Sequence, residues 1–539
     1  MTSALDIVNS SFTADKGSVV IDDSEWDGIK LLRIENTSIK AWNGQNNKVR
    51  LTQSVDMQDK FAEPPFQNQV SAIVNVDITT SGSLYVNAGR VSGANIRIDG
   101  SRYPSDNVTK VLVFGQNEVN DLSVETSDYK GIVYVVGRNI TDLTADSMLT
   151  NVYTYGNLFN STIYADADIV HRNISHAPTT GIASAYLDWV RNATDNVELA
   201  NVSDVSRTGT IDVQFAGSVR NGSFVAQQRV ILKVEADGKL DGAVADTFVS
   251  TTGSYTNTDP KADFVNVRIE AEKVVNTDVL TQNGNLPVVI TANDAISGGS
   301  FKTDTDLQVQ AVNGGIFAAD FDGTTVDITA KGDIVASNVT AAKYAKVIST
   351  DGELDGLTVV AGSALTEADI AEKAEAIIAK GTWIVGGEYI AEQGNIKAEA
   401  TVGSVVSAIL TAKAGDTQIS VNAEQEIDGI VISTPGDIFL TAYGITGGAY
   451  ISEHGDIALT ATGEDISGVY AKAKEGFVLI QTLVTEGGRK LDIIDTTADA
   501  HEFARIVASG NVIDSTAVSA TADALIASAI NYVHGYLFL

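Results

Sequence analysis

Short stretches in which apolar and polar residues alternate recur along the second half of the chain. Each stretch ends in a small residue, and the stretches are VVITA at Ala292, LQVQA at Ala311, VDITA at Ala330 and KVIST at Thr350, then ISVNA at Ala423, IFLTA at Ala442, IALTA at Ala461 and VLIQT at Thr482. The intervals are 19, 19 and 20 residues in the first group and 19, 19 and 21 in the second. A fixed interval of this length is the mark of a repeat architecture.

A second pattern follows most of these stretches, namely an apolar residue, a polar residue and then a glycine. It begins at Ile296, Leu354, Ile427, Ile445 and Ile466, and looser versions that end in Gly or Asp begin at Val91, Val119, Ile140 and Leu240. Gly, Asn and Asp tolerate positive φ, so we interpret the pattern as a corner between two strands. Short strands joined by such corners would close a coil of 19 to 21 residues.

Coils of this kind are expected to stack, with parallel strands about 4.8 Å apart and inward columns of Val, Ile, Leu and Ala. One coil cannot enclose its own inner face, whereas stacking stabilises the fold by roughly 1.5 to 3 kcal/mol for each large apolar side chain that it buries. The sequence therefore predicts an all-β fold, a parallel β-helix or β-solenoid. The alternative is a β-sandwich with chance similarity between strands, and the repeated intervals near 19 residues favour the solenoid.

Changes in the regularity of the pattern predict four segments. Residues 1–80 would form an N-terminal β cap or lead domain, 81–245 irregular Asn-rich coils, 246–500 regular Ala-rich coils, and 501–539 a C-terminal cap or assembly segment. Within the third segment, residues 366–380 predict an inserted helix, because Thr366 can cap it, Asp369 stands at its third position and Gly381 ends it.

The end of the chain predicts a short amphipathic helix with Leu525, Ile526, Ala529, Ile530 and Val533 on one side, followed by Gly535. The last four residues are apolar. A solenoid presents an unpaired strand edge at each end, so we expect these four residues either to cap the last coil or to contact a neighbouring copy. The assembly candidates are Tyr536, Leu537, Phe538 and Leu539.

Charge and composition limit the classes of partner and of chemistry that the chain could have. Lys and Arg total 36 against 69 Asp and Glu, a net charge of −33, which disfavours nucleic acid and anionic membranes. Cysteine is absent, which excludes disulfides, thiolate metal sites and cysteine nucleophiles. No apolar run could span a membrane, and the first residues lack a signal-peptide pattern, so if the protein is exported we expect this to be its mature form.

Two acidic stretches could hold a metal ion. DDSEWDG, residues 22–28, surrounds Trp26 with oxygen ligands suited to calcium, although the spacing of a calcium loop is missing and a solvated acidic turn is the alternative. DADIVHRNISH, residues 166–176, could also surround a metal ion, although an Asp-rich turn before a strand gives the same residues and is the interpretation that we favour. Apart from calcium we expect no cofactor. The candidate ligands are Asp22, Asp23, Glu25 and Asp27 in the first stretch and Asp166, Asp168, His171 and His176 in the second.

Ten Asn-X-Ser/Thr triplets could accept N-linked glycans if the protein follows a glycosylating export route. They would leave the second half of the chain almost bare, because nine of the ten precede residue 222. The triplets begin at Asn9, Asn36, Asn107, Asn139, Asn160, Asn173, Asn192, Asn201, Asn221 and Asn338.

No GxSxG, HExxH or GxxxxGK[ST] motif stands where it would position a nucleophile, zinc or phosphate, so we do not expect an enzyme. Residues 285–500, most clearly DIFLTAYGITGGAYISEHGDIALTA, resemble the coils of filamentous-haemagglutinin-like cell-surface proteins. The resemblance implies a secreted, elongated, non-catalytic body used in adhesion or in a cell envelope. The N-terminal secretion domain of such adhesins is not visible here.

The leading hypothesis is therefore a non-catalytic structural protein of the cell exterior that binds copies of itself to form a filament, sheath or surface layer. A first alternative is an adhesin or fibre stalk whose N-terminal half binds cell-surface glycans or a host protein. A second is a polysaccharide-degrading β-helix enzyme, which would need carboxylates projecting from adjacent coils at a set separation.

Overall fold

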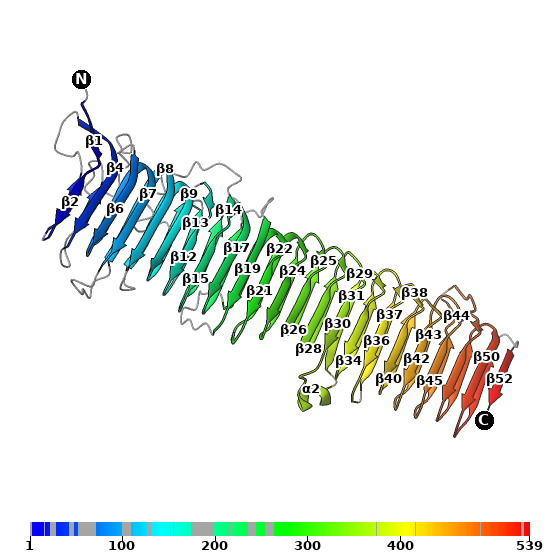
Figure 1. The fold of residues 1–539 in the computed structure, drawn as a ribbon. Helices are drawn as coiled ribbons and strands as arrows, with labels where there is room; N and C mark the ends of the chain where they lie inside the picture. The colour runs from blue at the N-terminus through cyan, green and yellow to red at the C-terminus, as the bar shows by residue number, and fades with distance from the viewer. Residues whose placement is uncertain are drawn as a thin grey trace. The chain divides into compact units, whose positions relative to one another are not determined.

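The structure is a computed structural model, and it describes residues 3–15, 17–21, 29–42, 48–51, 72–99, 109–126, 131–154, 156–173, 198–215, 217–234, 244–253, 264–372, 374–415, 417–485, 487–529 and 533–538. The chain divides into two compact units, residues 1–287 and 288–539. Both are parallel β-solenoids, with about 19 turns in all and about 21 residues in a turn (Figure 1). This confirms the predicted fold class. The division falls later than the change in composition near residue 245.

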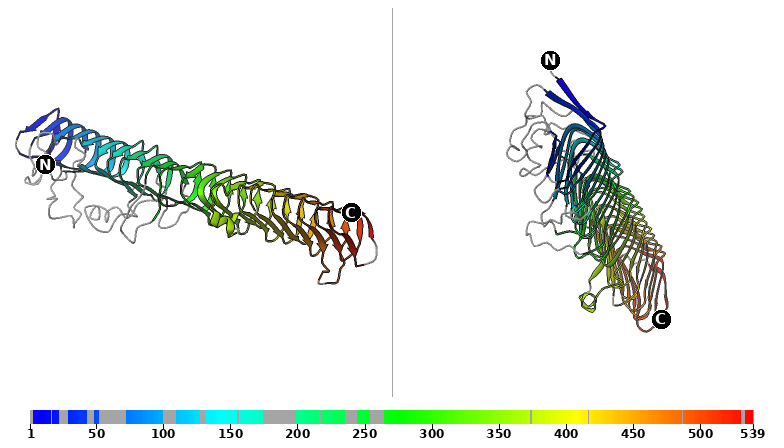
Figure 2. Two further views of the ribbon diagram at one scale, coloured as in Figure 1. Left: turned by 90° about the horizontal axis from the view of Figure 1, so that it is seen from below. Right: turned by 60° about the vertical axis from the view of Figure 1, so that its left-hand side comes forward.

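Each coil has three faces, and in a regular coil each face carries its own strand. In one coil of the second unit, β37 (Gln418–Ala423) lies on the first face, β38 (Glu426–Asp428) on the second and β39 (Val431–Thr434) on the third. They pair in parallel with β40 (Asp437–Ala442), β41 (Gly444–Thr446) and β42 (Ala449–Ser452) of the next coil. In several coils one long strand runs through a corner onto the next face. Figure 2 shows this stacking of successive coils within each unit.

Strands of the first unit begin near the N-terminus, and they are already part of the stack, because β1 and β2 pair in parallel with β4, and β4 with β6. The strands are β1 (Ser3–Val8), β2 (Ser11–Ala14), β3 (Val19–Ile21), β4 (Ile29–Ala41), β5 (Lys48–Leu51), β6 (Ala72–Thr80), β7 (Ser83–Ile98), β8 (Thr109–Thr126), β9 (Gly131–Ser147), β10 (Leu149–Thr154), β11 (Leu158–Phe159), β12 (Thr162–Ala165), β13 (Ile169–Asn173), β14 (Glu198–Ala200), β15 (Ser203–Ser206), β16 (Thr210–Phe215), β17 (Ser218–Ala226), β18 (Arg229–Val234), β19 (Val244–Thr251), β20 (Val267–Val275) and β21 (Asp278–Thr281).

Strands of the second unit are shorter and more evenly spaced. Besides β37 to β42 they are β22 (Val288–Ser297), β23 (Ser300–Thr303), β24 (Leu307–Ala311), β25 (Ile316–Phe317), β26 (Asp320–Ala330), β27 (Ile334–Val335), β28 (Asn338–Ser349), β29 (Leu354–Asp355), β30 (Thr358–Ala361), β31 (Glu375–Gly381), β32 (Ile384–Val385), β33 (Glu388–Ala391), β34 (Asn395–Ala400), β35 (Val405–Val406), β36 (Ile409–Ala412), β43 (Ile457–Ala461), β44 (Ile466–Ser467), β45 (Tyr470–Ala473), β46 (Val478–Thr482), β47 (Ile493–Ile494), β48 (Thr497–Ala500), β49 (Ala504–Ala508), β50 (Val512–Ser519), β51 (Ala524–Ser528) and β52 (Val533–Phe538).

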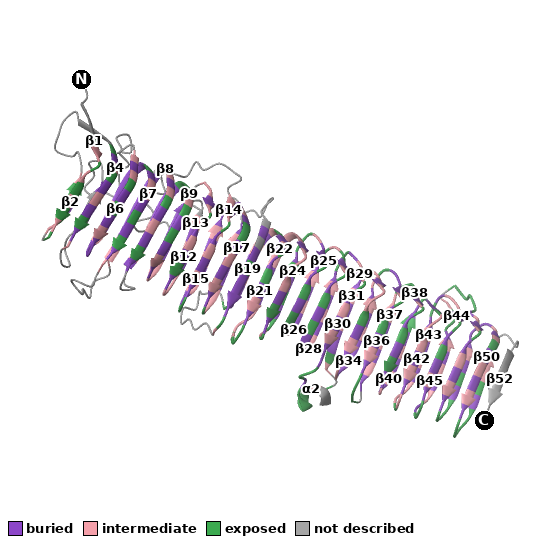
Figure 3. Cartoon of the chain, viewed as in Figure 1, coloured by how far each residue is buried: buried purple, intermediate pink, exposed green. Residues whose placement is uncertain are grey.

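The core consists of inward columns that run from coil to coil. Ile419, Ile438 and Ile457 are in register on the first face and are fully buried, as the period of two in each strand requires. Figure 3 shows the resulting alternation of buried and more exposed positions. Burial of each such side chain stabilises the fold by roughly 1.5 to 3 kcal/mol, so every interior coil depends on its two neighbours.

The predicted repeat is confirmed at Ala292, Ala311 and Ala330, which pair in sequence. The next step is one residue shorter than predicted, because Ala330 pairs with Ser349 rather than Thr350. Val347 points inward and is fully buried. The small inward residue that ends this strand is therefore two positions later, at Ser349.

The predicted corners are confirmed as residues with positive φ between the second and third faces. Gly429 has φ of 60° and Asp142 has φ of 53°. The same position holds Gly93, Asp121, Gly298, Gly356, Gly447 and Gly468, all with positive φ. The corner predicted after Leu240 lies outside the described residues.

The predicted helix at 366–380 is mostly wrong. Only α2 (Glu367–Ala371) is helical, and the segment after it is strand β31. Thr366 does cap the helix, since its Oγ1 accepts the Asp369 N–H at 3.2 Å. Ile377 pairs with Ala345 and is fully buried, so stacking on the coil before it outweighs the helical pattern.

The predicted C-terminal helix is also wrong. Residues 524–528 form β51, which pairs with β49, and residues 533–538 form β52, which pairs with β50. The apolar spacing at Leu525 and Ile526 fits a strand as well as a helix over so few residues, and the edge of the preceding coil selects the strand. No helix among the described residues is long and apolar enough to span a bilayer.

Candidate functional site

The first coil presents an open strand edge. In the described residues, β1 and β2 pair only with β4, and β3 pairs only with β5. Ile7 and Phe12 stand in register with Ile34 and Ile39. Ile34 and Ile39 are fully buried, whereas Ile7 and Phe12 are only half-buried. The inward columns are therefore left partly uncovered at this edge.

The last coil presents the complementary edge. Within the described part of the chain, β51 pairs only with β49, and β52 only with β50. Ile526 continues the inward column of Ile506, but Ile506 is fully buried and Ile526 is half-buried. The assembly candidates Tyr536, Leu537 and Phe538 lie on the edge strand β52, opposite Thr516, Ala517 and Val518. Leu539 lies outside the described residues.

Asn residues occupy most corners of the first unit, and this accounts for many of the glycosylation triplets. Asn36 has φ of 50°, and Thr37 after it donates its Oγ1 hydrogen bond to the Glu35 carbonyl at 2.9 Å. The third residue of the triplet, Ser38, opens the third-face segment of β4. The same arrangement places Asn9, Asn160, Asn201 and Asn221 at corners with positive φ.

The corner Asn side chains bond to one another along the stack. Asn201 Nδ2 donates to Asn160 Oδ1 at 3.0 Å, and Asn221 Nδ2 donates to Asn201 Oδ1 at 2.7 Å. Asn75 Nδ2 donates to Asn36 Oδ1 at 3.2 Å. A glycan is attached through Nδ2, so modification of Asn201 or Asn221 would compete with this ladder.

The other triplets differ in their surroundings. Asn338 Nδ2 donates to Asp320 Oδ1 at 2.7 Å, while Asn9 and Asn139 are exposed. Asn107 and Asn192 lie outside the described residues, and for Asn173 only the backbone is described. Glycosylation of these residues stays a prediction.

The candidate metal ligands do not converge. Asp22, Asp23, Glu25, Asp27 and His176 lie outside the described residues. Asp168 Oδ1 accepts the backbone N–H and the hydroxyl of Thr210 at 2.8 and 3.0 Å. Asp166 and His171 each have a different partner, given below. Among the described residues no three His, Asp or Glu side chains group as metal ligands would.

His171 and Asp204 form a polar pair inside the core of the first unit. His171 on β13 and Asp204 on β15 are 1% and 0% exposed, and Nε2 and Oδ2 are 2.6 Å apart. In their columns His171 lies between Val152 and Val213, and Asp204 between Ile163 and Phe224. His171 Nδ1 and Asp204 Oδ1 find no hydrogen-bond partner in the described structure. The pair thus links the first face to the third, and its neighbours in both columns are apolar.

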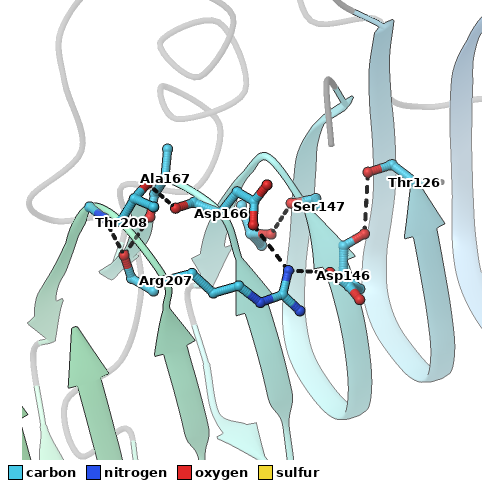
Figure 4. Close-up of polar contacts among 10 residues, drawn as sticks. Thr126, Asp146, Ser147, Asp166, Ala167, Arg207 and Thr208 are labelled. Carbon is cyan, nitrogen blue, oxygen red and sulfur yellow. Dashed lines mark hydrogen bonds and ion pairs between the residues drawn. The ribbon is translucent and has the colours of Figure 1, made fainter. Parts of the chain in front are cut away.

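Arg207 links successive coils at the corner between the third and first faces (Figure 4). Its Nη1 lies 3.1 Å from Asp166 Oδ1 and 3.7 Å from Asp146 Oδ1. Thr126 Oγ1 of the coil before donates to the Asp146 carbonyl at 3.3 Å. Asp166 is thus engaged in a structural ion pair, which explains its position in the sequence without a metal.

Two carboxylate contacts in the second unit shift pKa values. Hydrogen bonds from Thr366 lower the pKa of Asp369 to about 2, and the bond to Asp369 raises the pKa of Tyr344 to about 12. These contacts join the α2 insertion to β28. Burial, and then the nearby carboxyl of Glu464, raise the pKa of Glu426.

Sequence reasoning overlooked Asp204 and Arg207. Asp204 occupies the inward position of SDVS, where the neighbouring coils place Ile163 and Phe224. A charged residue at an inward position was the available signal, but it could be read only once the register was known. Comparison of the chain with protein-family models, with curated proteins and with solved structures finds no match.

Proposed function

We propose that this chain is a non-catalytic structural protein of the cell exterior whose copies stack end to end into a filament. The two open edges carry the proposal. Both consist of strands that run in the same direction around the coil, so the last coil of one copy can continue into the first coil of the next with parallel pairing.

The half-buried columns give this contact its driving force. Stacking β1 and β2 on β52 would cover Ile7 and Phe12, and it would place β3 two strand spacings beyond β51, so that Ile526 faces the junction between the two copies. Because the two edges differ, the contact is heterologous and does not close on itself, which is the geometry of an open filament. The net charge of −33 would favour solubility of the separate copies.

The resemblance to filamentous-haemagglutinin-like coils supports a place in a cell envelope or surface structure. Export of the chain and its place in a cell envelope or surface structure are parts of the same proposal. A filament is the form that the two open edges favour over a sheath or a surface layer. The glycan-binding and polysaccharide-degrading alternatives have no specific observation in their favour.

Ile526 and Leu525 provide a matched test on one strand. Ile526 points into the open end of the core, whereas its neighbour Leu525 points outward and is 44% exposed. We expect the unaltered chain to form concentration-dependent polymers in sedimentation velocity and negative-stain images. Ile526→Lys should remain unpolymerised because a charge would be buried at the contact, and Leu525→Lys should polymerise.

Deletion of Tyr536 to Leu539 should likewise leave a folded chain that no longer forms filaments, because β52 loses most of its edge. Circular dichroism would verify the fold of each variant. An unaltered chain that stays monomeric at high concentration would overturn the proposal, and so would equal polymerisation of Ile526→Lys and Leu525→Lys.

A further inference from the structure

The third face of the second unit carries a row of exposed apolar side chains on consecutive coils. The first outward residues of β36, β39, β42 and β45 are Ile409, Val431, Ala449 and Tyr470, and they are in register. Ile409, Val431 and Tyr470 are 43%, 42% and 40% exposed. The adjacent outward row contributes Ile390 and Ile451, which are half-buried. We call Ile390, Ile409, Val431, Ala449, Ile451 and Tyr470 the lateral patch.

The same position is polar in most coils of the first unit, with Phe248 of β19 as an exception. From β4 to β15 the corresponding residues, in register, are Ser38, Asp77, Asn95, Ser123, Thr144, Thr162 and Ser203. The outward side of this face therefore does not need apolar residues for the solenoid to fold. A contiguous exposed apolar patch is the usual mark of an interaction surface.

The first outward row of the lateral patch is complementary to itself about Val431, whereas on the adjacent row Ile390 would face Lys472 of the other copy. Glu388 lies two coils before Val431 and Tyr470 two coils after it. If two copies faced each other with a twofold axis along the strand direction, Val431 would meet Val431, and Ile409 would meet the small Ala449 of the other copy. Glu388 would meet the hydroxyl of Tyr470, beside the ammonium of Lys472.

Charge at the rim fits the same arrangement. Lys472 is 2.6 Å from Asp499 and its side chain is 38% exposed. Its ammonium has three N–H donors, so it can donate both to Asp499 and to Glu388 of a second copy. An opposed acid and base at each end of an apolar strip set both the direction and the register of the pair.

We propose that a second copy of this chain binds the lateral patch, antiparallel and face to face, as two β-sheets pack about 10 Å apart. This inference extends the proposed assembly, since side-by-side pairing would join filaments into a sheath or layer. The pairing uses a different surface from the end-to-end contact, so the two can be tested separately.

The test uses the Ile526→Lys variant, because this substitution removes the end-to-end contact between copies. Sedimentation velocity should show a monomer–dimer equilibrium. Val431→Lys should weaken dimerisation about tenfold or more, because two lysines would meet at the axis. Thr441→Lys, exposed on the first face, is the matched control and should dimerise like its parent.

Exchanging the large and the small side chain of one contact distinguishes the proposed register from non-specific hydrophobic association. Ile409→Ala alone leaves a gap and Ala449→Ile alone overfills the contact, so each should weaken dimerisation, whereas the two together should restore most of it. General hydrophobic association would instead strengthen with Ala449→Ile. A monomer at all concentrations, a dimer indifferent to Val431→Lys, or no rescue by the double variant would each overturn the inference. If the unaltered chain still forms filaments in any of these cases, the proposed function stands without it.

Discussion

The two units build the same corner from different residues. In the first unit the residue with positive φ is mostly Asn or Asp, and Asn side chains bond from coil to coil. In the second unit the position holds mostly Gly, with Ala at 318 and 336, Ser at 407 and Asp at 495 and 514. Gly meets the backbone requirement alone, whereas Asn meets it and adds a polar ladder. The backbone corner is thus the common requirement, and the side chain is free to vary.

The interior of the first unit is also more polar than that of the second at the following positions. The first unit holds the buried His171–Asp204 pair, while the first-face column of Ile419, Ile438 and Ile457 in the second unit is wholly apolar. The first outward position on the third face is polar in most coils of the first unit, whereas it is apolar or aromatic in the coils from β36 to β45 of the second. One solenoid plan therefore supports two surfaces, and we assign lateral contact to the second.

The largest expected effect comes from breaking the buried pair. Asp204→Ala would leave His171 buried without its partner and should lower the free energy of unfolding of the first unit by about 3 to 5 kcal/mol. Chemical unfolding followed by hydrogen exchange would measure the loss unit by unit. The double variant His171→Leu with Asp204→Val should recover much of the stability. If the single and double variants lose equally, the pair is not an interacting unit.

A smaller effect is expected at the glycine corners of the second unit. A Cβ on Gly448, which has φ of 96°, would lie 2.5 Å from Tyr450 Oη and 2.7 Å from the Ile430 carbonyl oxygen. Tyr450 is fully buried and cannot move aside. Gly448→Ala should therefore cost about 2 to 4 kcal/mol in thermal unfolding.

Gly429 is the matched control for that variant. It has φ of 60° and nothing within 4 Å of the added Cβ. Gly429→Ala should cost only about 1 kcal/mol, the strain of the left-handed conformation, which Ala318 and Ala336 already adopt. Equal losses in the two variants would mean that the close approach to Tyr450 has no energetic consequence.

The repeat, the parallel stacking and the corners could be predicted because each leaves a local mark, such as the small inward residue of IALTA or the glycine after Ile466. The helix at 366–380 was predicted wrongly because its local spacing is helical and only the neighbouring coil makes Ile377 an inward strand residue. The His171–Asp204 pair could not be predicted, since its members are 33 residues apart and on different faces. The lateral patch was missed because outward and inward apolar residues look alike until the register is known.

The Asn ladder should have a modest effect. Asn201→Gly keeps the permitted backbone conformation and removes only the two side-chain hydrogen bonds, so it should cost about 0.5 to 1 kcal/mol. Asn201→Ala adds strain at φ of 54° and should cost about 1 kcal/mol more. Thermal unfolding of both variants measures the two contributions. A neutral Asn201→Gly would show that the ladder adds nothing beyond the corner.

The smallest effect is expected at the α2 insertion of the second unit. The polar contacts there are those of Asp369 with Thr366 and Tyr344, whereas the first unit has the Asn ladder at its corners. The folded pKa of Asp369, about 2, lies below its ordinary 3.8, so the stabilisation is present above pH 3.8 and is lost as the pH falls toward 2. The pKa of Tyr344 is raised from 10.0 to about 12, so its share is present below pH 10 and is lost as the pH rises through 12. The hydrogen-exchange protection factors of residues 366–371 should therefore fall at both extremes of pH and stay constant between them. Asp369→Asn should remove the acid limb while leaving β28 protected, because the strand is held by its neighbours and not by the insertion. An acid limb that survives in Asp369→Asn would assign it to another carboxyl group.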